Sequence, residues 1–84
     1  MNLIIDIGNT QLKYAIFEKG EMLEFCVSEI QDITLIEGWQ KKYQNLDAAI
    51  VSSVQGKPDT FLDKLKPKFK SYILVISNVT YTVN

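Results

Sequence analysis

Histidine is absent and cysteine is nearly so: the 84-residue chain has no His and one Cys, Cys26. A zinc site built from His and Cys within the chain is therefore excluded, as is a catalytic triad based on histidine. A lone cysteine cannot form a disulfide within the chain. The groups that remain for chemistry are carboxylates, hydroxyls, amides, lysines and the backbone.

Excess charge and long apolar runs are also scarce. The formal net charge is −1, which gives no global electrostatic case for nucleic acid or an anionic membrane. No apolar run approaches the ~20 residues of a bilayer span, and the N-terminus lacks the basic and apolar regions of a secretion signal. We therefore predict a cytoplasmic protein, without nucleic-acid or membrane partners. The length suggests one domain with a modest core.

What the chain does contain is a regular succession of short apolar runs. These predict five strands: 2–7, 11–18, 22–28, 48–54 and 72–76. The turn signal Lys19-Gly20 makes the first three an antiparallel meander, and the run at 72–76 is expected to be buried. Two right-handed crossovers then make the last two strands parallel to the first. The sequence thus predicts a mixed sheet of strand order 3-2-1-4-5.

Two helical segments separate the later strands. The first begins near Asp32, where Thr34 and Glu37 are predicted to form a capping box. The second is expected to have Pro58 in its first position and to end near Lys66, since the following proline cannot continue a helix. Both helices are available to cover a face of the sheet.

A polar stretch lies between the first two predicted strands. Asp6 is near the carboxyl end of the central strand, where open α/β sheets bind ligands, and a carboxylate buried there would need a partner such as a divalent cation. Gly8 allows a close turn whose N–H groups can form an anion-binding nest, Asn9 and Thr10 add polar side chains, and Lys13 adds a charge suited to phosphate. These are the parts that phosphoryl transfer needs. A plain turn, with Asp6 bonded to its own backbone, is the simpler interpretation.

The run from Asp6 to Lys13, DIGNTQLK, resembles the Asp-x-Gly-Asn-Thr-x-x-Lys/Arg phosphate motif of type III pantothenate kinases. These enzymes belong to the superfamily of acetate kinases, sugar kinases, heat-shock chaperones and actin. The stretch AAIVSSV, residues 48–54, is similar to the family's fourth strand. The resemblance covers nearly the whole chain. It implies an α/β, ribonuclease H-like β-β-β-α-β-α-β fold with helices covering the sheet.

The resemblance also implies a site and its ligands. The expected ATP phosphate-binding residues are Asp6, Gly8, Asn9, Thr10, Gln11 and Lys13. Asp6 would organise Mg²⁺ through water. Ser52 and Ser53 are candidates for the lining of the substrate cleft, or simply small residues at a strand end. The family phosphorylates pantothenate with ATP in coenzyme A biosynthesis, needs a monovalent cation (K⁺ or NH₄⁺) and forms homodimers.

The chain departs from the family in length, because family members have a second half of the same fold. The Gly-x-Asp-Arg segment that holds the proposed base is expected beyond Asn84. We therefore expect residues 1–76 to be an N-terminal subdomain with the phosphate-binding hairpin, and residues 77–84 to begin a connection to a second half. No catalytic residue is expected within the chain, and the isolated chain is predicted to be inactive.

Other functions fit these residues less well than a kinase does. A nuclease of the same fold needs several converging carboxylates for two metals, whereas the fourth strand ends in Ser52 and Ser53. The alternating lysines from Lys64 to Lys70 are interpreted as a solvated surface over an apolar anchor, not a nucleic-acid site. A non-catalytic transcription-accessory or assembly module of the same fold remains the alternative.

Overall fold

The computed structural model of the 84-residue chain describes residues 1–53 and 60–76. Its strands are β1 (Asn2–Ile7), β2 (Leu12–Glu18), β3 (Glu21–Ser28), β4 (Ala48–Ser53) and β5 (Ser71–Ile76). Its helices are α1 (Ile33–Lys42), α2 (Thr60–Leu65) and the short 3₁₀ helix η1 (Lys66–Lys68). One sheet of order β3-β2-β1-β4-β5 contains all five strands. The β1–β2 and β2–β3 pairs are antiparallel, and β1–β4 and β4–β5 are parallel, so the predicted fold is confirmed.

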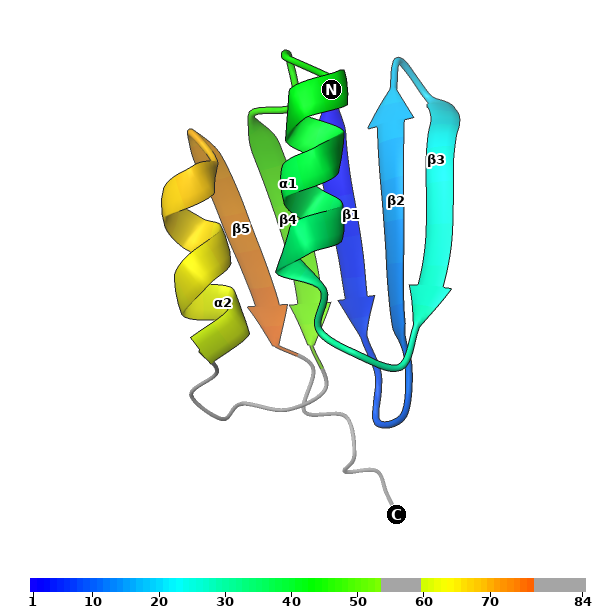
Figure 1. Cartoon of the computed structure of the whole chain (residues 1–84), viewed down its shortest axis with the longest axis vertical. Helices are drawn as coiled ribbons and strands as arrows, with labels where there is room; N and C mark the ends of the chain where they lie inside the picture. The colour runs from blue at the N-terminus through cyan, green and yellow to red at the C-terminus, as the bar shows by residue number, and fades with distance from the viewer. Residues whose placement is uncertain (54–59, 77–84) are drawn as a thin grey trace.

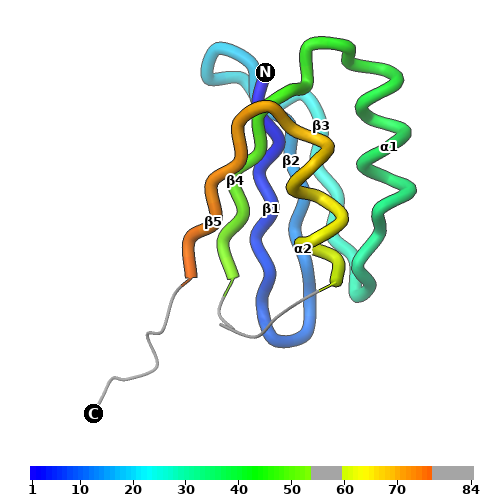
Figure 2. Tube along the Cα trace, turned by 90° about the vertical axis from the view of Figure 1, so that its left-hand side faces the viewer, coloured from blue at the N-terminus to red at the C-terminus, as the bar shows by residue number. Residues whose placement is uncertain are grey.

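Both helices lie on one face of the sheet (Figures 1 and 2). The two crossovers progress in the same direction, from β1 to β4 and on to β5, and right-handed connections of that kind leave their helices on the same side. The core lies between these layers. Its sheet side is formed by Leu3, Ile5, Ile7, Leu12, Tyr14, Ile16, Ala49 and Val51, and its helix side by Ile36, Trp39, Phe61, Leu65 and Phe69.

The helix boundaries confirm one prediction and correct another. Regular helix stops at Leu65 and η1 follows through Pro67, as the proline predicts. The start of α1 differs: Asp32 is the N-cap, and its Oδ1 accepts a 3.1 Å hydrogen bond from the Leu35 N–H. The capping box of Thr34 and Glu37 is therefore wrong. The Glu37 carboxylate instead pairs with a lysine of η1. Pro58 lies outside the described residues.

The opposite face of the sheet is apolar. None of the elements in residues 1–53 and 60–76 packs on it (Figure 2). The exposed side chains there include Phe25 and Val27 on β3, Ile50 on β4, and Ile73 and Val75 on β5. The prediction of a buried last strand is wrong, because β5 is an edge strand with only Tyr72 half-buried. An apolar run of strand length does not reveal whether both faces are covered.

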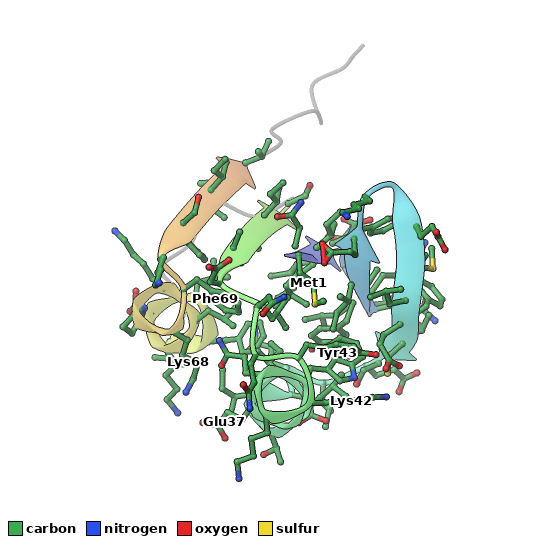
Figure 3. All side chains as sticks on the ribbon, turned by 90° about the horizontal axis from the view of Figure 1, so that it is seen from above. Met1, Glu37, Lys42, Tyr43, Lys68 and Phe69 are labelled. Atoms are coloured by element: carbon green, nitrogen blue, oxygen red, sulfur yellow. The ribbon has the colours of Figure 1, made fainter. Side chains whose placement is uncertain are left out.

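Ionic contacts join α1 to its neighbours at the end of the sheet far from the β1–β2 turn (Figure 3). Lys42 Nζ lies 2.8 Å from Glu24 Oε2 of β3, and the Tyr43 hydroxyl donates to the same oxygen. The hydrogen bonds from Lys42 and then Tyr43 lower the pKa of the Glu24 carboxyl. Lys68 Nζ lies 2.8 Å from Glu37 Oε2, which joins η1 to α1. This lysine of the alternating run therefore has a structural role.

Within the described residues, no helix is long and apolar enough to cross a membrane.

Candidate phosphate-binding site

The turn between β1 and β2 closes with a short backbone bond. The Gly8 N–H donates to the Gln11 carbonyl at 2.9 Å, and a Cβ on Gly8 would lie 3.2 Å from that oxygen. Glycine is thus favoured here by a close approach, since Gly8 does not have a positive φ. The expected nest is modified, because the Gly8 N–H is already used inside the turn. Asn9 and Thr10 at its tip are exposed and accessible to a ligand.

Asp6 and Lys13 face each other beside this turn. They are Cα partners in the antiparallel β1–β2 pair, and both are exposed on the face without helices. With the turn residues they line a hollow of about 180 Å³, hereafter the Lys13 hollow. The expectation of a buried Asp6 is wrong. The carboxylate is exposed to water, so it does not require a cation to offset the cost of burial. Its position places a carboxylate and an ammonium at the carboxyl end of β1, beside exposed amide and hydroxyl groups.

A larger hollow lies on the other, helix-covered side of the same turn. Its volume is about 310 Å³, and it is lined by the turn together with Glu29, Gln31, Ser53 and Leu62; it is hereafter the Glu29 hollow. Ser53 is buried there. Ser52 is on the opposite face, in register with Asp6. The two candidate cleft-lining serines are therefore separated, one on each side of the sheet.

The connection between β3 and α1 forms one wall of the Glu29 hollow. It crosses the lower ends of β1 and β2 (Figure 1). The buried Tyr14 hydroxyl holds it in two places, donating to the Ile30 carbonyl at 3.0 Å and accepting from the Asp32 N–H at 3.1 Å. Burial is the main cause that raises the pKa of Tyr14. Sequence reasoning missed Glu29 and Gln31, and the signal was weak: two polar residues alternating around Ile30, just before the helix cap.

Comparison with known proteins identifies relatives of this chain, although no family model matches it. A type III pantothenate kinase of Bacteroides fragilis is 43% identical over 54 residues, which are 64% of this chain and 22% of that protein. A type III pantothenate kinase of Christiangramia forsetii is 38% identical over 76 residues, 89% of this chain and 30% of that protein. The resemblance to type III pantothenate kinases is confirmed. The chain spans less than a third of the length of these kinases.

The fold comparison agrees with this resemblance. A solved structure from Porphyromonas gingivalis, assigned as an N-acetylglucosamine kinase, superposes with a TM-score of 0.62 and 19% identity. The match covers 89% of this chain and 34% of that protein. At this identity the likeness concerns the fold alone. It supports the ribonuclease H-like arrangement that the pantothenate kinase resemblance implies.

The carboxylates near the turn decide which kind of metal site the described residues could form. No cluster of three or more His, Cys, Asp or Glu side chains occurs in the part of the chain that the structure describes. Mg²⁺ in phosphoryl-transfer sites is commonly held by one or two carboxylates, substrate phosphates and water, so a single exposed Asp6 fits that role. A two-metal nuclease centre requires converging carboxylates, and the described residues do not provide them.

Proposed function

We propose that this chain supplies the phosphate-holding turn of an ATP-dependent kinase that phosphorylates pantothenate in coenzyme A biosynthesis. The observation that carries the proposal is the position of Asp6 directly across the strand pair from Lys13, beside a turn with exposed Asn9 and Thr10, at the carboxyl end of the central strand. The names of the relatives support the kinase and its substrate.

Each residue of the turn has a proposed part. Asp6 holds Mg²⁺ through water, and Lys13 neutralises charge on the transferred phosphate. Gly8, Asn9, Thr10 and Gln11 contact the phosphates through the backbone and polar side chains. Mg²⁺ held near Asp6 would offset the negative charge of the phosphates. The catalytic base, the monovalent cation and the homodimer are expected only from the resemblance to type III pantothenate kinases. Because the base is expected elsewhere, we propose that this chain alone binds Mg·ATP without turning it over.

Calorimetric titration with Mg·ATP tests the proposal. Lys13→Met removes a charged phosphate contact, so we expect the affinity to fall about 10- to 100-fold. Asp6→Asn should reduce affinity for Mg·ATP but change the weak binding of metal-free ATP little. Lys41→Met and Asp47→Asn are charge-matched controls at exposed positions outside the turn, and should bind as the wild type does.

Two results would count against the proposal. If the wild-type chain does not bind Mg·ATP, the non-catalytic module, whether transcription-accessory or assembly, becomes the better interpretation. If the controls lose as much affinity as the Asp6 and Lys13 variants, the binding is a general charge effect. Phosphorylation of pantothenate by the purified 84-residue chain would refute the proposal that the base lies elsewhere.

A further inference from the structure

The two hollows beside the turn differ in charge. The Lys13 hollow carries a lysine and a carboxylate. Among the residues that the structure describes, the lining of the Glu29 hollow contains no lysine, and its one ionisable group is the Glu29 carboxylate. The other polar residues of its described lining carry amides or hydroxyls and include Gln31 and Ser53, and its apolar residues include Leu62. Such a lining disfavours an anion and suits hydroxyl and amide groups.

Glu29 is available to bind a ligand in this hollow. Its side chain is exposed, and within residues 1–53 and 60–76 it makes no hydrogen bond or ion pair. A carboxylate of this kind accepts hydrogen bonds from a hydroxyl more strongly than a neutral group does.

The wall that carries Glu29 is held in place before any ligand arrives. Besides the two bonds of the Tyr14 hydroxyl, the Ile30 N–H donates to Ser28 Oγ at 3.1 Å, so the residue next to Glu29 is anchored at both its N–H and its carbonyl. Beyond it, Asp32 is fixed as the cap of α1. A wall ordered in advance lowers the entropic cost of binding.

We propose that the Glu29 hollow binds the hydroxyl end of a hydroxyl- and amide-bearing acceptor, and that the anionic donor occupies the Lys13 hollow. Glu29 is the specificity-determining residue that accepts a hydrogen bond from the acceptor hydroxyl, and Tyr14 is a positioning residue that acts through the wall. A volume of about 310 Å³ is at the small end of ligand sites, which suits one end of a molecule. That this ligand accepts a phosphate rests on the proposed function. The difference in charge between the linings of the two hollows does not depend on it.

Backbone-amide NMR titration of the 84-residue chain tests this with a matched pair of probes. Both probes have the same hydroxyl-bearing end and the same amide, and at the other end pantothenol has an uncharged hydroxyl where pantothenate has a carboxylate. We expect both to shift the amide signals of Gln31 and Ser53 with similar affinity. Glu29→Gln should weaken both about tenfold, whereas the control Glu21→Gln, on the exposed far end of β3, should weaken neither.

The sign of the Glu29→Gln effect decides the orientation. If the carboxylate end of pantothenate entered this hollow, Glu29→Gln would tighten pantothenate and leave pantothenol unchanged, which would overturn the proposal. So would the absence of shifts at Gln31 and Ser53 with either probe.

A separate variant tests the positioning role. Tyr14→Phe should weaken both probes while Mg·ATP still binds with wild-type affinity at the Lys13 hollow, and Tyr43→Phe should leave both affinities unchanged. An equal loss of probe and Mg·ATP affinity in Tyr14→Phe would indicate general destabilisation and refute positioning. Binding of Mg·ATP without the probes contradicts the placement of the acceptor in the Glu29 hollow and leaves the proposed function standing. Binding of the probes without Mg·ATP contradicts the proposed function and the placement of the donor, and leaves the role of Glu29 standing.

Discussion

The Tyr14 hydroxyl offers a sharp test of what holds the β3–α1 connection. Tyr14→Phe removes one oxygen atom from a fully buried side chain and leaves the ring in the core. The oxygen both donates to the Ile30 carbonyl and accepts from the Asp32 N–H. No cavity of ring size forms, so the change isolates these two hydrogen bonds.

The expected cost follows from their number and position. A typical hydrogen bond contributes about 1 kcal/mol net, and leaving partly buried partners unsatisfied costs about 1–3 kcal/mol. Water can reach the Ile30 carbonyl and the Asp32 N–H only in part, because both bonds are partly buried. We therefore expect Tyr14→Phe to lower the free energy of unfolding by about 2 kcal/mol. A domain near this size should then melt roughly 8–16 °C lower.

Urea denaturation followed by Trp39 fluorescence measures the loss, with Tyr43→Phe as the control. The Tyr43 hydroxyl donates to the Glu24 carboxylate in a bond that is also partly buried, but that carboxylate keeps its exposed hydrogen bond from Lys42 when the hydroxyl is removed. We expect that variant to lose less than about 0.5 kcal/mol. If the two variants lose equal stability, or if Tyr14→Phe loses none, the hydroxyl does not anchor the connection.

The pH dependence of stability gives a second measurement on Tyr14. Burial raises its pKa above the ordinary value of 10.0, so the folded state holds the phenolic proton more tightly than the unfolded state. The stability linked to this proton is complete below pH 10.0 and is lost as the pH rises through the folded pKa. Tyr14→Phe should remove that part of the alkaline loss. An unchanged alkaline profile would contradict the assignment.

Three further predictions concern stability, each read from urea denaturation. Leu3→Ala should cost about 2–5 kcal/mol because Leu3 is fully buried, whereas Leu23→Ala, on a side chain 41% exposed, should cost less than about 1 kcal/mol; equal losses would contradict the described core. Asp32→Ala should cost about 1 kcal/mol through loss of the α1 cap, and Asp32→Asn much less. The contacts with Lys42 and Tyr43 lower the pKa of Glu24, so their contribution to the stability of the folded state is present above pH 4.5 and is lost as the pH falls through the folded pKa. If Glu24→Gln leaves the loss of stability in acid unchanged, this prediction is refuted.

Much of the fold could be predicted because local signals agreed with global rules. Runs of alternating or continuous apolar residues marked the strands, and right-handed crossovers then permitted few arrangements. The start of α1 shows the limit. Thr34 and Asp32 are both residue types that cap helices, and in the structure the capping residue Asp32 is also held by the Tyr14 hydroxyl, which accepts from its N–H from a distant strand. No local pattern contains that contact.

Of the two hollows beside the turn, the sequence indicates the residues of only one. The residues from Asp6 to Lys13 are contiguous in sequence and form a motif, so the Lys13 hollow could be predicted. Glu29 and Gln31 reach the same turn through the β3–α1 connection, which depends on where the helices pack. The exposure of Asp6 could not be predicted from the sequence either. Alternation along β1 places Asp6 on the face opposite Ile5 and Ile7, but it does not indicate whether other elements cover that face.

The one-sided packing of the sheet accounts for the chemistry of the turn. Alternate side chains of β1 and β2 point to opposite faces, so Asp6 and Lys13 project to the open face while Ile7 and Leu12 project to the covered one. The helices bring the β3–α1 connection, and with it Glu29, only to the covered face. A single turn therefore separates a hollow lined by a lysine and a carboxylate from one whose described lining has a carboxylate as its charged group. Covering both faces alike would remove this difference, which is why the helix arrangement and not the turn motif alone determines which charged groups lie on each side.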